Sequence, residues 1–280
     1  MAVGQHNLED EKEELAEGTL ISHLVELRQR LVRAVLAIFV IFIVLVPFSQ
    51  EIFEFVSRPL QDALPENSSF IVTGVATPFL TPFKTTLFVA LFAAMPVVLY
   101  QAWQFVAPGL YRRERRFAVP LVVSSILLFY AGVAFAYFVV FKLVFGFFVG
   151  VTPENVVNSP DIDQYLGFVL RLFFAFGLAF EVPIATFMLV WSRLVSIETL
   201  GKARAYVFLG AFIVGMFLTP PDVFSQTLLA IPIYLLYESG LILARLLLRE
   251  RLAEAAAEAA TDAAVEADDE DAPSDDDTIR

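Results

Sequence analysis

The chain has 280 residues, of which 58% are hydrophobic and 18% are charged, a composition too apolar for an ordinary soluble domain. It contains no cysteine, which excludes disulfides and thiolate metal sites. The net charge of −12 lies at the two ends, because residues 1–18 carry −5 and residues 248–280 carry −9, whereas the part between them carries +2.

Six apolar runs predict an all-α membrane protein with six transmembrane helices. A helix needs about 20 apolar residues to cross a hydrocarbon core of about 30 Å. The runs are Leu31–Phe48, Thr85–Ala107, Val119–Phe148, Tyr165–Trp191, Ala205–Leu218 and Ser225–Leu248. The first run follows an acidic segment, which is the wrong order for a removable signal peptide, so we expect none.

Positive charge is concentrated on one side of these runs. Of the 19 Lys and Arg residues, 15 lie in segments that share a side if every run crosses the membrane. The other side and the spans hold Arg58, Lys84, Lys142 and Arg171. Because cationic loops stay in the cytoplasm, both termini are expected to be cytoplasmic.

The charge distribution also divides the chain. We expect an acidic N-terminal segment at 1–18, a helical membrane domain at 19–248 and an acidic cytoplasmic tail at 249–280. The tail is rich in Ala, Glu and Asp and poor in large apolar residues, so most of it is expected to be disordered. It is either a solvated tail or a segment that binds a partner.

The segment Thr19–Arg30 is expected to form a helix that enters the membrane. Its leucines recur at spacings of four, three and four and therefore lie on one stripe. Glu26 and Arg30 are four residues apart and can pair. The segment is either an interfacial anchor or a polar face on which Glu26 and Arg28 meet a cytoplasmic ligand.

The first external segment, Ser49–Lys84, is the longest connection between spans. A short surface helix is expected over Glu51–Ser57, ended by Pro59. The stretch that follows is interrupted repeatedly by proline and glycine. A loop of this length is typical of a functional or capping element. Its apolar side chains either fold over the bundle or contact lipid.

The second connection reads PGLYRRERR and covers Pro108–Arg116. Glu114 stands there among four arginines, the last of which is Arg116. The arginines can enforce topology, with Glu114 relieving their mutual repulsion. Alternatively, Glu114 is a carboxylate that they keep ionised, ready to bind an incoming guanidinium through charge-assisted hydrogen bonds.

Glu181 lies far inside the fourth run, where a carboxylate is costly and by default functional or bundle-facing. Pro183 follows two residues later and can bend the helix. A bent helix with a buried acid suggests a polar concavity, so the six helices are expected to form a curved, concave bundle. Gln226 and Glu238 in the sixth run are expected to face the same cavity. Arg171 is about 15 Å from Glu181 along an ideal helix, too far to pair with it.

The fifth run, Ala205–Leu218, is about 21 Å long as a helix, which is shorter than the hydrocarbon core. The residues Thr219–Asp222 end it abruptly, and the sixth run begins almost at once. We therefore expect a tight helical hairpin that thins the membrane locally.

Four segments together resemble TatC, the signal-peptide receptor subunit of the twin-arginine protein translocase, in its Gram-negative bacterial form. They are HLVELRQRL (His23–Leu31), QAWQFVAPGLYRRERR (Gln101–Arg116), FAFGLAFEVP (Phe174–Pro183) and FLTPPDVFSQTLLAIP (Phe217–Pro232). Each segment is weak evidence alone, but their order on six spans is specific.

The resemblance implies a function in protein export and a location in the bacterial inner membrane. TatC-like proteins bind twin-arginine signal peptides of folded cargo, assemble with the single-span subunits TatA and TatB and with further copies of themselves, and depend on the proton-motive force. The resemblance implies no cofactor, metal, catalytic residue or nucleic acid. It does imply contact with membrane lipids. The matching signal-peptide residues are Glu26, Arg28, Phe105, Glu114 and Arg116.

The remaining matches lie inside the membrane or outside it. Glu181, Gln226 and Met216 match positions on the concave face and in the partner-contact region, since the short fifth span is similar to a docking site for a partner helix. Pro59 and Asp222 match positions in the external loops.

Two other functions fit the sequence less well. A secondary transporter with Glu181 as proton carrier is disfavoured because the spans show no repeated half and no evident substrate site. An intramembrane enzyme is disfavoured because the sequence has neither HExxH nor GxSxG, and its two histidines, His6 and His23, lie outside the spans.

Overall fold

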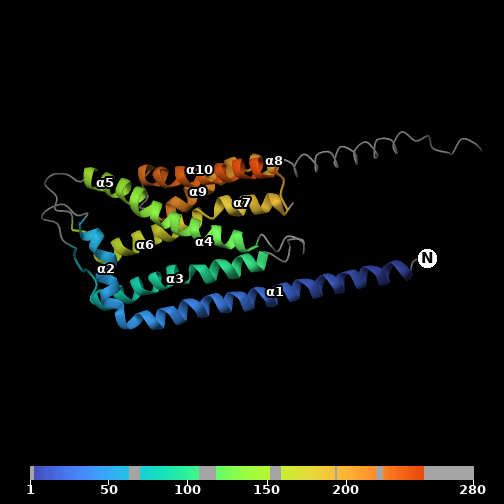
Figure 1. Cartoon of the computed structure of the whole chain (residues 1–280), viewed down its shortest axis with the longest axis horizontal. Helices are drawn as coiled ribbons and strands as arrows, with labels where there is room; N and C mark the ends of the chain where they lie inside the picture. The colour runs from blue at the N-terminus through green and yellow to red at the C-terminus, as the bar shows by residue number, and fades with distance from the viewer. Residues whose placement is uncertain are drawn as a thin grey trace, which may run out of the picture.

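A computed structural model describes residues 3–62, 70–106, 118–151, 159–192, 194–218 and 223–248. Nearly all of these residues are helical (Figure 1). The elements are α1 (Val3–Leu45), a 3-10 turn (Val46–Phe48), α2 (Ser49–Asp62), α3 (Thr77–Val106), α4 (Ala118–Phe135), a π-helical turn (Ala136–Val140), α5 (Phe141–Val151), α6 (Ile162–Ala179), α7 (Val182–Trp191), α8 (Ile197–Lys202), α9 (Arg204–Leu218) and α10 (Val223–Leu247).

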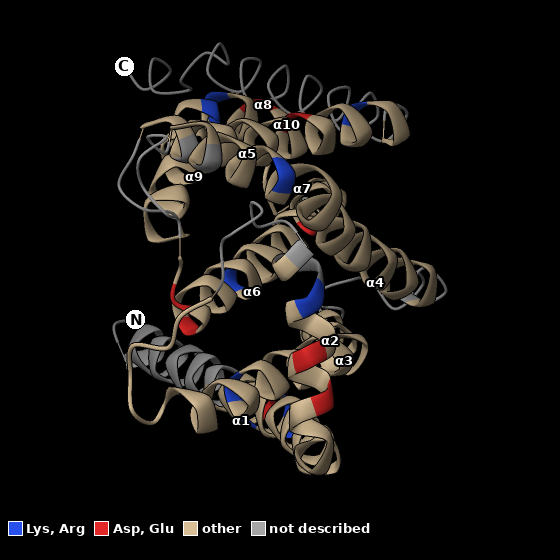
Figure 2. Ribbon diagram, turned by 90° about the vertical axis from the view of Figure 1, so that its left-hand side faces the viewer, with Lys and Arg blue, Asp and Glu red and all other residues tan. Residues whose placement is uncertain are grey.

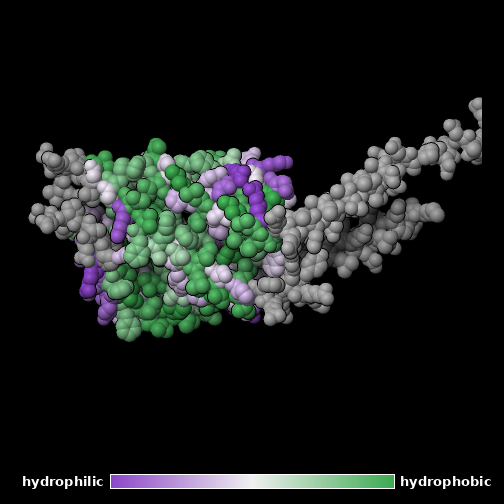
Figure 3. All heavy atoms as spheres, turned by 45° about the horizontal axis from the view of Figure 1, so that its top comes forward, coloured by the Kyte–Doolittle hydropathy of each residue, from purple (hydrophilic) through white to green (hydrophobic). Residues whose placement is uncertain are grey.

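Five helical segments in the described part of the chain are long and apolar enough to cross a membrane. They are Ile21–Arg58, Thr77–Phe105, Val119–Phe148, Ile162–Trp191 and Gln226–Leu247. The helix Arg204–Leu218 is apolar but shorter, which confirms that the fifth predicted run is the short one. Figure 3 shows a broad hydrophobic zone with hydrophilic residues gathered towards both ends of the visible face.

The helices lie side by side with their long axes roughly aligned (Figure 1). α1 packs against α3, which also contacts α4 and α6, and α10 packs against α7 and α9 on the other side of the molecule (Figure 2). Only 6% of the most apolar window of the first span is buried. α1 is therefore an edge helix whose exposed apolar surface suits contact with lipid.

Two predicted helix boundaries were wrong. α1 begins at Val3 rather than at Thr19, so the acidic segment and the first span form one continuous helix of 43 residues. α2 does not end at Pro59 but continues to Asp62. A proline removes one N–H donor, and the packing of α2 against α3 supports the helix despite that loss.

The predicted bend before Pro183 is confirmed. α6 ends at Ala179 and α7 begins at Val182, so the helix is interrupted at Phe180 and Glu181. α10 packs directly onto this break, because a Cβ placed on Gly240 would lie 2.8 Å from the Cα of Pro183. The interruption thus puts Glu181 at a junction between two helical segments rather than on a regular helix face.

α4 and α6 cross at two glycines. A Cβ placed on Gly132 would meet the carbonyl group of Phe176, with the carbonyl carbon at 2.9 Å, and a Cβ on Gly177 would lie 2.5 Å from the ring of Phe129. Phe129 and Phe176 are fully buried, so neither can move aside. Small residues at such crossings let helix backbones approach closely.

Substitution of Gly132 by alanine should therefore destabilise the bundle. The added methyl group meets backbone atoms that cannot shift, and overpacking of this kind costs about 1–3 kcal/mol. The measurement is the free energy of unfolding in mild detergent. The matched control is Gly146→Ala, since a Cβ at that position meets nothing within 4 Å. Equal stability of the two variants would contradict the crossing.

Candidate functional site

The first cluster of polar residues joins α1 to the last turns of α3. Arg30 donates from Nε and Nη2 to Oε1 of Glu26, at 2.9 and 2.5 Å, and from Nη1 to Oε1 of Gln104 at 2.8 Å. Gln104 in turn donates to the hydroxyl of Tyr100. The Arg30 side chain is 15% exposed and that of Glu26 is 35% exposed. The predicted pairing of Glu26 with Arg30 is therefore confirmed, and it extends to a second helix.

Phe105 belongs to the same cluster. Its ring stacks on that of His23 with centroids 4.3 Å apart. Glu26 and Phe105, predicted from separate segments, are thus both placed where α1 meets the end of α3. Arg28 is exposed on α1 and makes no hydrogen bond to another described residue. Glu114 and Arg116 lie outside the described residues, so their predicted roles stay predictions.

The second cluster surrounds Glu181 at the break between α6 and α7. The indole Nε1 of Trp103 donates to Oγ of Ser125 at 2.8 Å, and the Ser125 hydroxyl donates to Oε2 of Glu181. Ser125 is fully buried. The other carboxyl oxygen, Oε1, is also buried and has no hydrogen-bond partner among the described residues.

Gln226 and Glu238 do not join this cluster, which corrects the expectation of one shared cavity. Gln226 donates to the carbonyl of Phe212 at 2.8 Å and so ties α10 to α9. Glu238 receives two bonds from Arg204, at 2.6 and 3.0 Å, and one from Tyr234 at 3.0 Å. Glu238 thus neutralises a charge at the start of α9, which the spacing along the sequence did not indicate.

Met216, the remaining predicted partner-contact residue, lies on α9 with 51% of its surface exposed. The neighbouring Gly215 packs against Gln226, since a Cβ there would lie 3.1 Å from Cγ of that residue. The α9–α10 hairpin is therefore closely packed on its inner side and apolar on its outer side.

An apolar cavity of about 520 Å³ opens between α4, α7 and α10. It begins next to the helix break, because Pro183 and Ile184 line it together with Leu121, Leu128, Phe187 and Leu243. Its size lies in the range of ligand pockets, and its lining suits an aliphatic segment rather than a polar one.

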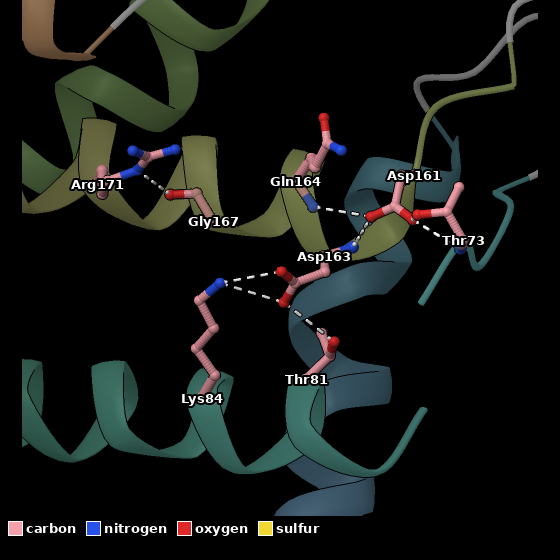
Figure 4. A network of polar contacts seen from close by, with 8 residues as sticks. All are labelled: Thr73, Thr81, Lys84, Asp161, Asp163, Gln164, Gly167 and Arg171. Atoms are coloured by element: carbon pink, nitrogen blue, oxygen red, sulfur yellow. Dashed lines mark hydrogen bonds and ion pairs between the residues drawn. The ribbon is translucent and has the colours of Figure 1, made fainter. Parts of the chain in front are cut away.

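A third polar cluster, drawn in Figure 4, lies at the opposite end of the bundle, where α3 and α6 begin (Figure 1). Asp161 caps α6 by accepting from the backbone N–H groups of Asp163 and Gln164 at 3.0 and 3.1 Å. It also accepts from the N–H and hydroxyl of Thr73 at 2.9 and 2.6 Å. Asp163 pairs with Lys84 at 3.1 Å.

This cluster joins the first external segment to the start of α6. Ile71 exchanges backbone hydrogen bonds with Pro160 and Ile162 at 3.1 and 3.0 Å, and Phe70 packs against Tyr165 with ring centroids 5.1 Å apart. Phe70 and Ile71 of this segment therefore fold onto the bundle, whereas Phe79, later in the same segment, remains exposed. Pro59 lies within α2, where its side chain is outside the described part, and Asp222 lies outside the described residues.

Protonation of Asp161 at low pH should weaken this cluster and lower the stability of the fold. The hydroxyl of Thr73 and the backbone N–H groups hold the pKa of Asp161 down at about 2. A lowered carboxyl pKa stabilises the fold above the ordinary pKa of about 3.9, and this stabilisation is lost as the pH falls towards 2. The unfolding midpoint of the wild type should therefore approach that of Asp161→Asn between about pH 4 and pH 2.

Thr73→Val is the matched variant, because it removes the strongest donor to Asp161 and should move the loss of stability to higher pH. A midpoint difference between wild type and Asp161→Asn that stays constant over this pH range would show that the contact does not depend on the charge of Asp161.

Sequence reasoning missed Trp103, Ser125, Gln104 and Arg204 as members of polar clusters. A signal for the first two was present, because a buried hydroxyl or indole N–H inside an apolar run needs a partner. Their partners could not be named, since Ser125 and Glu181 are 56 positions apart.

The fold and these clusters define a class, that of polytopic helical membrane proteins with a polar site at one end and a carboxyl group within the membrane-spanning part. The family model described as Sec-independent protein translocase protein (TatC) matches residues 22–232. The chain belongs to the TatC family, as the resemblance of its four segments predicted.

Individual relatives agree. The chain is 60% identical over 221 residues to the Sec-independent protein translocase protein TatC of Azotobacter chroococcum mcd 1, covering 79% of this chain and 87% of the relative. It is 54% identical over 226 residues to TatC of Escherichia coli (strain K12), covering 81% and 88%. A crystal structure of the twin arginine translocase receptor TatC superimposes with a TM-score of 0.74 at 38% identity, covering 80% of this chain and 98% of that one.

Proposed function

We propose that this protein is the receptor subunit that binds twin-arginine signal peptides at the cytoplasmic face of the inner membrane. The observation that carries this proposal is the placement of Glu26. Both hydrogen bonds from Arg30 end on Oε1 of Glu26, so that Oε2 remains available to an incoming guanidinium, and the carboxyl group is partly exposed. A carboxylate so placed suits charge-assisted binding of arginine.

Glu114 supplies the second carboxylate in this proposal. It is eight positions beyond the end of α3, and α3 packs against α1, so the two acids come from adjoining parts of the chain. Phe105 and His23 form an aromatic face close to Glu26 at the junction of α1 and α3, and the proposal adds Arg28 and Arg116 to the site. Two carboxylates can bind a pair of guanidinium groups, with one bidentate contact each.

The topology follows from the charges. Six spans with both termini in the cytoplasm put the α1–α3 cluster and the arginine-rich connection on the same side. The domain boundaries at 18 and 248 follow the same charge pattern. The apolar part of a signal peptide needs shelter inside the membrane, and the cavity between α4, α7 and α10 has the lining and size for part of it.

The partner subunits enter the proposal through the membrane-embedded residues. One buried carboxyl oxygen of Glu181 has no hydrogen-bond partner among the described residues, and Met216 presents an exposed apolar side chain on the short α9. We assign these regions to contact with the single spans of TatA and TatB in a multimeric complex, in which transport of folded cargo is driven by the proton-motive force.

Glu114→Gln and Glu26→Gln should each weaken binding of a twin-arginine peptide. Loss of a charge-assisted hydrogen bond costs about 1.5–3 kcal/mol, which corresponds to a roughly 10- to 150-fold higher Kd. Fluorescence anisotropy of a labelled peptide, with the full-length protein in nanodiscs, measures the affinity. Glu114→Asp keeps the charge and should lose less. A twin-lysine peptide is the control ligand, and affinity unchanged in both glutamine variants would remove these acids from the site.

Glu181→Ala should change the contacts of the protein with a partner span. A carboxyl group in hydrocarbon is stabilised by a polar partner, so its removal should weaken crosslinks from a photoreactive residue beside position 181 to TatA or TatB, while peptide binding at the cytoplasmic face is retained. Crosslinks of the same yield and the same partner in both proteins would refute the contact.

A further inference from the structure

The last turn of α3 connects the two polar clusters through three consecutive residues. Trp103 points to Ser125 and thereby to Glu181. Gln104 accepts from Arg30, which holds Glu26. Phe105 stacks on His23 of α1. Because one helical turn carries all three contacts, it cannot shift at one cluster without shifting at the other.

Chemistry fixes the direction of the first hydrogen bond in the inner cluster. An indole N–H can only donate, so Oγ of Ser125 must accept from Trp103. The Ser125 hydroxyl in turn donates to Oε2 of Glu181. Ser125 is 0% exposed, so water does not compete for this hydrogen. Oε2 is thereby committed as an acceptor, and Oε1 is the oxygen left for another group.

The hydroxyl of Ser125 is used differently from other hydroxyls in these helices. Serine and threonine in helices commonly bond to a carbonyl of the preceding turn, as Thr86 does to Pro82 at 2.8 Å and Thr227 does to Val223 at 2.6 Å. Ser125 instead donates across to the junction of α6 and α7. A bond of this kind fixes the position of the group that receives it.

We propose that Trp103 and Ser125 are positioning residues, which hold Glu181 with Oε1 presented to an incoming donor and which tie this carboxyl group to the cytoplasmic end of α3. This inference rests on the proposed function, because it takes the α1–α3 cluster as the site of the signal peptide. A peptide guanidinium that binds Oε2 of Glu26 shares this carboxylate with Arg30, and a shift of Arg30 is passed to Gln104 and, through the same helical turn, to Trp103.

Tryptophan emission tests the first half of this proposal. The chain contains 2 tryptophans, so Trp191→Phe leaves Trp103 as the sole emitter. In the full-length protein in nanodiscs, Ser125→Ala removes the acceptor of the indole N–H and should shift the emission of Trp103 to shorter wavelength. Ser125→Thr keeps a hydroxyl and should shift it less. The matched control is Ser124→Ala, since Ser124 is exposed on the same helix and should leave the emission unchanged.

Titration of the same protein with a twin-arginine peptide that lacks tryptophan tests the connection. The emission of Trp103 should change with the midpoint that anisotropy gives for peptide binding, and the change should be lost in Ser125→Ala. A peptide that fails to bind overturns the proposed function, whereas the emission shift of Ser125→Ala still tests the positioning of Glu181. Normal binding with no change in emission overturns the connection.

Export rates test whether the positioning matters for transport. Trp103→Phe keeps an aromatic ring and loses the N–H, and loss of one hydrogen bond corresponds to about a threefold to tenfold effect. Trp103→Phe and Ser125→Ala should each slow export to this extent, with unfolding midpoints measured to confirm that the variants fold. In combination with Glu181→Gln, neither should slow export further. Additive losses would mean that both residues act independently of Glu181 and would overturn the proposal.

Discussion

A polar group inside an apolar bundle must find its partner within the protein, because the core of the bilayer holds no water to replace it. This constraint determines where α3 ends in relation to its neighbours. Arg30 on one side and Glu181 on the other are both stabilised by side chains from one turn of α3, directly by Gln104 and through Ser125 by Trp103. A helix that contacts α1, α4 and α6 is the element that can satisfy both, whereas α7, α9 and α10 pack with one another on the other side of the molecule.

Much of the fold could be predicted from the sequence because its signals are local. Hydropathy located the long spans and the short α9, and Pro183 located the break in the fourth span. The wrong boundaries were local as well: nothing in the acidic segment forbids a helix that starts at Val3, and Pro59 removes a donor without ending α2. The pairing of Arg204 with Glu238 could not be predicted, because the two are 34 positions apart and their meeting depends on how α9 and α10 pack.

The candidate site divides in the same way. Glu26 and Glu181 could be named from residue type and place, since an acid at a membrane boundary or inside a span is costly and by default functional or bundle-facing, whereas Phe105 was named only through the resemblance to the TatC family. The residues that hold these acids in place could not be named from the sequence. Ser124 and Ser125 are adjacent serines, and only the rotation of α4 determines which of the two faces Glu181. Gly132 and Gly146 likewise look alike in sequence, although one touches a neighbouring backbone and the other meets open space.

The ion pair between Arg204 and Glu238 has a consequence for the surrounding lipid. α9 has 15 residues and is therefore about 22 Å long, some 8 Å less than the usual hydrocarbon core. Because the pair holds the first residue of α9 against Glu238 of α10, α9 cannot slide along α10 to share this deficit between its two ends. We therefore expect the shortfall at the Phe217 end of α9, with shorter or more disordered acyl chains beside it. Short-chain lipids are then expected to gather at that end of the hairpin.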